Sequence, residues 1–267
     1  MAKYEAGFIG AGSMGGALAA AAIKAVGGEQ VAVSCSAPER SAAAAERLGC
    51  TAETPEVILR ESRYVFLGVK PQVIEKVTQS LANSIRESNA VFVSMLAGVD
   101  LARLEALLGE ANKRIIRIMP NTPCAVGQGL ILLAANQRVT AEELAGFRAL
   151  MAPAGLLDEL PEHLIDAASA LSGCGPAYAC LFLEGLADGA VACGLPRDKA
   201  LRYAAQMLLG SAELALTSGK HPGQLKDEVC SPGGSTIQGV RALEAGGFRG
   251  LCMEAVDAAF RKTKQLG

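Results

Sequence analysis

The stretch that decides the fold is YEAGFIGAGSMGGAL, residues 4–18. Its apolar first part has the character of a buried strand. Gly10, Gly12 and Gly15 then form the pattern GxGxxG, and residues 13–26 continue with helical character. A glycine turn between a strand and a helix lets a pyrophosphate approach the backbone, where the free amides of the helix start attract it. The predicted dinucleotide-binding residues here are Gly10, Gly12, Ser13, Met14 and Gly15.

Short apolar runs alternate with helical segments through the first 160 residues. Strands are expected at residues 4–9, 30–34, 64–69, 90–94, 114–119, 130–134 and 156–160. Ser36 is expected to cap the helix after the second strand, since it stands three residues before Glu39. This alternation predicts an α/β fold that begins with a Rossmann-type domain, residues 1–160, built on a parallel, doubly wound sheet.

Strand signals stop after about residue 161, and helical periodicity takes over. Helices are expected at residues 163–171, 176–194, 196–219, 235–245 and 248–266. The sequence therefore predicts an all-α second domain, residues 161–267, with a cleft between it and the sheet domain.

Composition excludes several classes of protein. Of the 267 residues, 51% are hydrophobic and 4% aromatic, which suits buried parallel strands and closely packed helices. The net charge of −2 gives no basic surplus for nucleic acid. The chain lacks a signal peptide's apolar core, and its apolar runs are shorter than the roughly 20 residues that span a bilayer. We expect a cytoplasmic protein without a membrane partner.

The eight cysteines include no CxxC pair, and the chain has two histidines. This pattern predicts no metal site. It favours reduced and mostly buried thiols that act as small apolar side chains. Cys174 and Cys230 differ from the rest because each lies in a glycine-rich loop.

The end of the second strand bears on the choice of cofactor. NAD sites usually place an acid there to hold the ribose 2′-hydroxyl. This chain has Ser36 and, further on, Arg40, which suit a 2′-phosphate. The alternative is that Ser36 only caps a helix and Arg40 is solvated. We predict NADPH as the cofactor, with NADH as the alternative.

Two further strands end in prolines. Val69, Lys70 and Pro71 follow one strand, and Asn121 follows another. Ligands of open α/β sheets bind at these carboxyl ends, so Lys70 and Asn121 are predicted to meet the nicotinamide half of the cofactor. Val69 and Pro71, on either side of Lys70, are predicted to belong to the same cofactor site. The alternative is that the prolines simply end the strands.

The helical half contains two glycine-rich helix starts, SGCGPAY at 172–178 and CSPGGST at 230–236. Free amides at such starts suit a small anion such as a carboxylate. The alternative is a proline–glycine corner with a serine cap. With the dinucleotide domain, these turns favour a reductase for a small anionic substrate.

At this point the whole chain resembles the pyrroline-5-carboxylate reductases, which catalyse the last step of proline biosynthesis. The resemblance rests on IGAGSMGGAL at 9–18, VKPQ at 69–72, MPNTP at 119–123, SGCGPAY at 172–178 and HPGQLKDEVCSPGGSTI at 221–237. Cys174 is a departure, because the family usually has serine there. A thiol donates hydrogen bonds poorly, so we expect an altered substrate affinity.

The resemblance implies an oxidoreductase that uses NADPH or NADH to reduce 1-pyrroline-5-carboxylate to L-proline. It also implies a homodimer, assembled further into a decameric ring of dimers. Thr236 corresponds to the family's proposed proton donor. The substrate-binding residues that the resemblance implies are Ser172, Cys174, Gly233, Gly234, Ser235 and Thr236.

Two rival interpretations remain open. The β-hydroxyacid dehydrogenases also join a Rossmann domain to a helical one, but normally carry a catalytic lysine in the second domain. Here Lys199 and Lys226 lie outside the glycine turns. The other rival is an NADP(H)-binding regulator without activity, which the presence of Thr236 and its loop disfavours.

Overall fold

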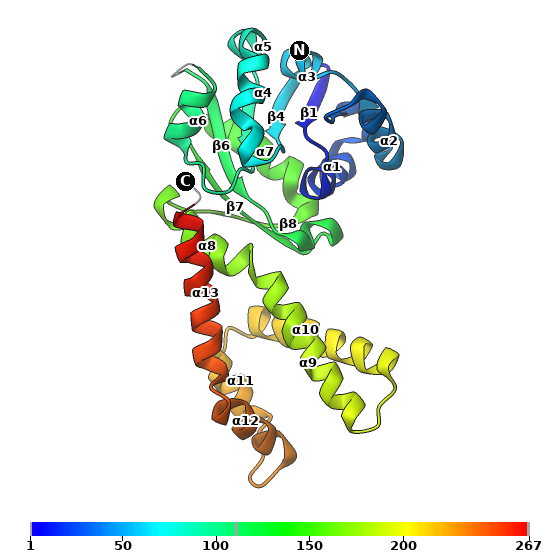
Figure 1. Cartoon of the computed structure of the whole chain (residues 1–267), viewed down its shortest axis with the longest axis vertical. Coiled ribbons are helices and arrows are strands. Elements are labelled where there is room, and N and C mark those ends of the chain that lie inside the picture. The colour runs from blue at the N-terminus through cyan, green and yellow to red at the C-terminus, as the bar shows by residue number, and fades with distance from the viewer. Residues whose placement is uncertain (1, 110–111, 266–267) are drawn as a thin grey trace. The chain divides into compact units, whose positions relative to one another are not determined.

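The computed structural model describes residues 2–109 and 112–265. Within them, eight strands form one sheet in the order β3-β2-β1-β4-β5-β6-β7-β8 (Figure 1). The strands are β1 (Tyr4–Ile9), β2 (Val31–Ser34), β3 (Thr51–Ala52), β4 (Ser62–Leu67), β5 (Val91–Ser94), β6 (Arg114–Met119), β7 (Gly129–Ala135) and β8 (Gly155–Glu159). The predicted Rossmann-type sheet domain followed by helices is confirmed.

The chain divides into two compact units. The sheet unit consists of the chain up to Cys174 together with the C-terminal segment that begins at Ala259. The helical unit is Gly175–Ala258. The α-helices that begin in the sheet unit are α1 (Ser13–Val26), α2 (Pro38–Leu48), α3 (Pro55–Glu61), α4 (Ile74–Ser80), α5 (Ala82–Glu87), α6 (Leu101–Leu107), α7 (Ala141–Met151) and α8 (Glu162–Ser172). Short 3₁₀ turns are η1 (Gly28–Gln30), η2 (Pro71–Val73), η3 (Thr122–Val126) and η4 (Ala152–Ala154).

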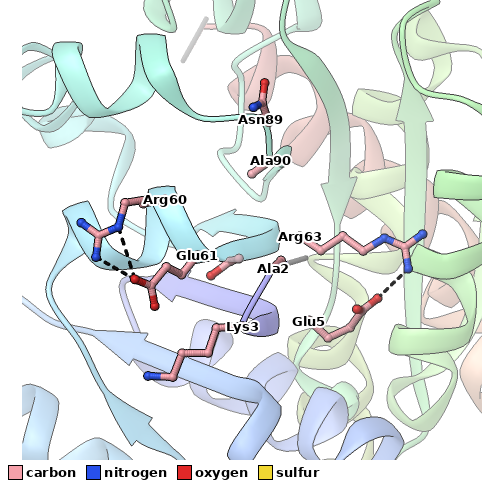
Figure 2. Close-up of a pocket in the computed structure, with 9 residues that line it drawn as sticks. Ala2, Lys3, Glu5, Arg60, Glu61, Arg63, Asn89 and Ala90 are labelled. Atoms are coloured by element: carbon pink, nitrogen blue, oxygen red, sulfur yellow. Dashed lines mark hydrogen bonds and ion pairs between the residues drawn. The ribbon is translucent and has the colours of Figure 1, made fainter.

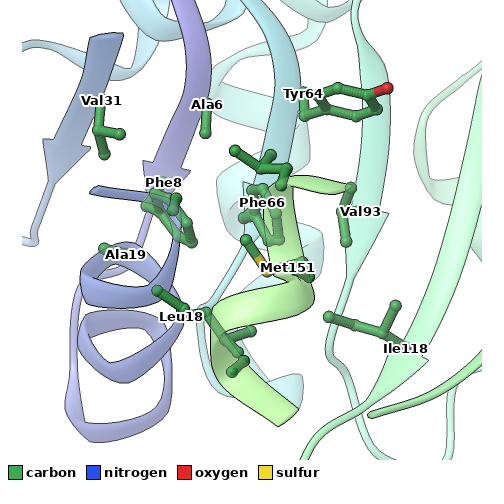
Figure 3. Packing of buried hydrophobic residues seen from close by; sticks show 14 of the residues in the cluster. Ala6, Phe8, Leu18, Ala19, Val31, Tyr64, Phe66, Val93, Ile118 and Met151 are labelled. Carbon is green, nitrogen blue, oxygen red and sulfur yellow. The ribbon is translucent and has the colours of Figure 1, made fainter. Parts of the chain in front are cut away.

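The sheet is buried on both faces, which explains its continuous apolar runs. Alternate strand residues point to opposite layers, so Phe66 packs with Phe8 and helix α1, while Leu67 packs with helices α3 to α6. The rings of Phe8 and Phe66 stack with centroids 4.3 Å apart, close to Leu18 and Met151 (Figure 3).

Strand β7 corrects the expectation of a wholly parallel sheet, because it pairs antiparallel to β6. A parallel crossover takes a dozen or more residues, usually a helix, whereas the chain between β6 and β7 contains only the short turn η3. Strand β8 then pairs parallel to β7. The two-residue strand β3 and the break between α4 and α5 were also outside the prediction.

A buried arginine ties the end of the chain to the sheet. Arg117 of β6 has a side chain only 3% exposed, and it donates to Asp166 on α8 at 2.7 Å. Glu162 accepts from it at 3.3 Å, and Lys264 lies 3.2 Å from the second oxygen of Asp166. Burial acts to raise the pKa of Asp166, but the hydrogen bonds from Arg117 and Lys264 outweigh it and hold that pKa below its ordinary value.

The helical unit contains little core of its own. Its helices are α9 (Gly175–Ala192), α10 (Arg197–Ser218), α11 (Pro222–Glu228), α12 (Ser235–Ala245) and most of α13 (Phe248–Lys264). The Tyr178 hydroxyl donates to the carbonyl of Ala255 at 3.2 Å, and Phe182 packs on Phe248 with centroids 5.3 Å apart. Its buried hydrophobic residues in the described structure are three alanines, Ala187, Ala200 and Ala204.

The eight cysteines are all free thiols, yet only Cys124 is buried, so the expectation of mostly buried thiols is wrong. The exposed ones are Cys180, Cys193 and Cys252, and all three belong to the helical unit, which has little core of its own. By length and composition, the helical stretch Glu162–Ala192 could cross a membrane, so the expectation that every apolar run is too short is wrong. Of its most apolar window, 11% is buried. A helix that packs on a partner subunit shows the same pattern.

Candidate functional site

The glycine turn after β1 has the geometry that its sequence predicts. Gly10 adopts a φ of +105°, and its amide donates to the carbonyl of Ser34 at 2.8 Å. A side chain on Gly15 would lie 2.1 Å from the Gly10 carbonyl oxygen, so this glycine lets helix and strand pack closely. At Gly12, by contrast, an added Cβ meets nothing described within 4 Å, which leaves room over the first turn of α1.

This turn opens into a cavity of about 690 Å³ at the carboxyl ends of β1, β2 and β4. The cavity brings together six of the predicted cofactor residues, Gly10, Gly12, Ser36, Arg40, Val69 and Lys70. Ser13, Met14 and Gly15 form the first turn of α1, and Pro71 begins η2 beside Lys70. Sequence reasoning missed Ala11, Cys35, Ala43, Ala44, Arg47, Gly68 and Val73, which also line it.

The signal for part of this missed set was present in the sequence. Ala43, Ala44 and Arg47 follow Arg40 at the spacing of one helix face, so one cavity residue on α2 implies the others. Gly68 belongs to the close approach of β1 and β4, because a Cβ there would lie 2.4 Å from the Gly10 carbonyl oxygen.

Ser36 does not cap α2, which corrects the sequence expectation. The helix begins at Pro38 with Ala37 at the N-cap position, and the Cys35 amide donates instead to Ser41 Oγ at 2.9 Å. The predicted box fails because Ser36 stands one residue too early for the helix start. Ser36 is exposed and lines the cavity, where its hydroxyl can meet a ligand.

The cavity carries a marked charge bias. Arg40, Arg47 and Lys70 line it, and no carboxylate is among its described lining residues. The acid at the end of the neighbouring strand, Glu53, accepts a hydrogen bond from the Tyr4 hydroxyl at 2.6 Å and lies outside this lining. Because a dinucleotide phosphate brings two or more negative charges, the open glycine cradle and these cations fit NADP(H).

Asn121 lies outside this cavity and is held by other contacts. Its side-chain nitrogen donates to the carbonyl of Ser172 at 3.0 Å, and its side-chain oxygen accepts from the amide of Leu130 at 2.9 Å. Asn121 thus joins the end of α8 to the start of β7.

At the end of α8, the structure provides a polar group without a described partner. Ser172 Oγ is buried and makes no hydrogen bond among the described residues. The Ser169 carbonyl accepts from the amides of Gly173 at 2.8 Å and Cys174 at 3.2 Å, which closes the last turn of α8. Ser172 Oγ is therefore a buried oxygen without a described partner, and the partly buried Cys174 stands two residues further on.

The other predicted substrate residues form a turn in the helical unit. The Gly234 amide donates to the Ser231 carbonyl at 3.0 Å, with Pro232 and Gly233 between them. Gly233 has a φ of +71°, so proline and glycine occupy the positions that a type II turn requires. Helix α12 starts directly after Gly234 with no described side-chain cap, and its first residues Ser235 and Thr236 are exposed.

A larger cavity, of about 840 Å³, lies at the amino ends of β1 and β4. Four of its charged side chains pair with one another, Arg60 with Glu61 and Arg63 with Glu5 (Figure 2), and Lys3 pairs with Glu53 outside the lining. Since open α/β sheets bind ligands at the carboxyl ends of their strands, the smaller cavity is the candidate site.

Comparison with known proteins agrees with this geometry. A family model described as pyrroline-5-carboxylate reductase dimerisation matches residues 162–266, and one described as NADP oxidoreductase, coenzyme F420-dependent, matches residues 5–98. Pyrroline-5-carboxylate reductase 3 of Macaca fascicularis is 39% identical over 99% of this chain and 97% of its own length. This chain belongs to the pyrroline-5-carboxylate reductase family.

Other members of the pyrroline-5-carboxylate reductase family agree over nearly the whole length. The enzyme of Escherichia coli is 38% identical over 99% of this chain and 98% of its own. The crystal structure of Plasmodium falciparum pyrroline carboxylate reductase with NADP bound superposes with a TM-score of 0.89 and 30% identity, over 100% of this chain and 99% of that one. The sequence resemblance to this family is therefore confirmed.

Proposed function

We propose that this chain reduces 1-pyrroline-5-carboxylate to L-proline with NAD(P)H, as the last step of proline biosynthesis. The observation that carries this proposal is the cation-lined cavity at the β1 glycine turn, in a chain whose full-length relatives are named pyrroline-5-carboxylate reductase. We assign cofactor binding to residues 1–160, and substrate binding and dimerisation to residues 161–267.

The cofactor in this proposal is NADPH in preference to NADH. Gly10, Gly12, Ser13, Met14 and Gly15 hold the pyrophosphate, and Ser36 and Arg40 the 2′-phosphate. Lys70 and Asn121 contact the nicotinamide half in this proposal, and Val69 and Pro71 are cofactor residues on either side of Lys70. The lack of a carboxylate among the described lining residues supports the preference, since an acid would repel a 2′-phosphate. When bound, the reduced nicotinamide supplies the hydride that reaches the C=N carbon.

The substrate carboxylate binds at Gly233, Gly234 and Ser235. Uncapped amides at the start of α12 and the positive end of the helix favour an anion there. Ser172 and Cys174 complete the substrate residues of the proposal. The unpaired Ser172 hydroxyl supports a ligand contact at that position, because a buried polar atom gains from a partner.

Thr236 is the proposed catalytic residue. Hydride addition to the C=N carbon requires a proton at the ring nitrogen, and the Thr236 hydroxyl either relays it or orients an imine that is already protonated. His221 has another task, because its Nδ1 accepts from the Gly223 amide at 3.0 Å as the cap of α11. Much of the rate then comes from positioning two small reactants.

A dimer is the assembly that the dimerisation match supports. Exposed apolar side chains of the helical unit, such as Leu216 at 80% exposure, agree with it. We extend this to a homodimer, assembled as a decameric ring of dimers, in the cytoplasm and without a membrane partner.

One assay tests the function against its rivals. NADPH oxidation is followed with 1-pyrroline-5-carboxylate and, in parallel, NADP⁺ reduction with a panel of 3-hydroxy acids. The proposal expects turnover with the imine and none with the hydroxy acids. Turnover of a hydroxy acid alone would indicate a β-hydroxyacid dehydrogenase, and cofactor binding without any turnover would indicate a regulator.

A further inference from the structure

Helix α2 presents a stripe of four residues to the cofactor cavity. Arg40 and Arg47 stand at its two ends, and Ala43 and Ala44 lie between them. A separation of seven residues returns to nearly the same helix face, about 10 Å further along the axis. The two alanines are short, so the guanidinium groups can approach one ligand from two places.

The two arginines lie beside different parts of the cavity wall. Arg40 stands in the first turn of α2, close in sequence to Ser36 and the carboxyl end of β2. Arg47 instead reaches the first turns of α1, because a Cβ on the buried Gly16 would lie 3.6 Å from its Nη2 atom. Gly16 thus leaves Arg47 room beside the helix start that carries Gly12 and Ser13.

We infer that Arg47 binds the pyrophosphate of the dinucleotide while Arg40 binds its 2′-phosphate, so that affinity and cofactor choice are divided between the two ends of one helix. This inference rests on the proposed function. Neither arginine has a described ion-pair partner, and both are exposed, so each guanidinium is available to a phosphate. A planar guanidinium donates two parallel hydrogen bonds to phosphate oxygens, which a neutral side chain cannot replace.

A purely structural role for Arg47 gives a different expectation. Arg47 is the basic residue in the last turn of α2, where a cation stabilises a helix through its dipole. In that case its loss would lower the melting temperature and leave ligand binding unchanged.

The test is calorimetric titration of four ligands, NADPH, NADH, ADP and 2′,5′-ADP, into the full-length protein. The variants are Arg47→Gln, Arg40→Gln and Lys24→Gln, and the last is a matched control that removes an exposed cation from the far end of α1. ADP carries the diphosphate without the 2′-phosphate, whereas 2′,5′-ADP carries the 2′-phosphate without the diphosphate.

The inference expects Arg47→Gln to weaken NADPH, NADH and ADP alike, by about tenfold, as the loss of a hydrogen bond to a charged group implies. Arg40→Gln should weaken NADPH and 2′,5′-ADP by a similar factor and leave NADH and ADP unchanged. Lys24→Gln should bind all four ligands like the wild type.

Three results would overturn the inference. In the first, Arg47→Gln binds every ligand with normal affinity. In the second, it binds only NADPH and 2′,5′-ADP more weakly. In the third, its melting temperature falls while its affinity for every ligand stays normal. Arg47→Lys separates charge from geometry and should recover part of the ADP affinity. A wild type that binds neither NADPH nor NADH would instead refute the proposed function, so the two failures are distinguishable.

Discussion

The two units of this chain differ in how much each completes by itself. The sheet unit encloses two apolar layers around fully buried residues such as Phe8, Phe66 and Phe92. The helical unit buries only small alanines in the described structure, and leaves large side chains such as Leu209 and Leu216 at 59% and 80% exposure. The sheet unit therefore has a hydrophobic core within the single chain, whereas the helical unit has almost none.

In the proposed function, this difference separates cofactor binding from substrate reduction. The cofactor cavity is built from residues of the sheet unit alone, on strands that are already buried. The turn at Gly233 and the residue Thr236 belong instead to the helical unit, which matches a dimerisation model and exposes large apolar side chains. Cofactor affinity should therefore be a property of one subunit, whereas turnover should depend on the pairing of helical units.

The largest effect should come from Thr236→Val, which keeps the shape of the side chain and removes its hydroxyl. General acid–base help is worth on the order of 10²–10⁴-fold, so kcat should fall at least about tenfold and more than KM rises. Cofactor affinity should barely change, because the cofactor site belongs to the sheet unit. Steady-state kinetics and NADPH titration check both parts.

Ser235→Ala is the matched control, because it removes a neighbouring hydroxyl without touching the proposed proton donor. It should raise KM more than it lowers kcat. A near-normal kcat in Thr236→Val would mean that the loop only shapes the pocket and that water supplies the proton.

Gly12 and Gly15 are predicted to have different roles in the sheet unit, one in cofactor binding and the other in packing. Gly12→Ala adds a methyl group where a Cβ meets nothing described, so stability should hold while NADPH affinity falls by about tenfold. Gly15→Ala forces a methyl group against the Gly10 carbonyl oxygen, which should destabilise the fold by about 1–3 kcal/mol. Thermal unfolding measures the stability of both variants, and titration measures their NADPH affinity. Equal melting temperatures for the two variants would contradict the assigned roles.

A smaller effect is expected at Asp166, where the sheet unit holds the end of the chain. Asp166→Asn removes one charge from the hydrogen bond with Arg117 and should lower the free energy of unfolding by about 1.5–3 kcal/mol at neutral pH. Because the folded-state pKa of Asp166 is lowered, its contribution is present above the unfolded pKa of about 3.9 and is lost as the pH falls through the folded pKa.

Denaturant unfolding from pH 7 to pH 3 measures this difference. The difference in stability between the wild type and Asp166→Asn should narrow as the pH falls below about 3.9. A difference that stays constant with pH would show that the carboxylate charge contributes nothing.

Local sequence signals sufficed for most of the sheet unit. The glycine turn at Gly10 depends on neighbouring residues and occurs as predicted. The capping box that Thr140 and Glu143 form at the start of α7 also depends on residues close in the sequence. The reversal of β7 could not be predicted from strand patterns, because an apolar run has the same sequence in either direction. Strand β3 has two residues, too few to show a period.

The missed parts of the site depend on tertiary contacts. In the sequence, nothing distinguishes Arg47 from other surface cations. Its place in the cavity depends on the packing of α2 against α1, where Gly16 leaves space for its side chain. Ser36 and Glu39 have the spacing of a capping box, but the observed helix begins at Pro38. The exposure of Cys180 has a similar origin, because the face of α9 that carries it faces solvent in one chain.

The central claim, that one subunit suffices for cofactor binding and that turnover needs paired helical units, is tested most directly by the double variant Leu209→Glu, Leu216→Glu. These leucines are seven residues apart on α10, so two new carboxylates occupy one helix face and should oppose pairing. Leu156→Glu on β8, an exposed leucine of the sheet unit at 65% exposure, is the matched control. Light scattering gives the mass, titration gives the NADPH affinity, and NADPH oxidation with 1-pyrroline-5-carboxylate gives turnover.

The account predicts a monomer that binds NADPH within about twofold of the wild type and has lost nearly all turnover. A monomer that turns over normally, or one that has lost NADPH binding while its sheet unit stays folded, would contradict it.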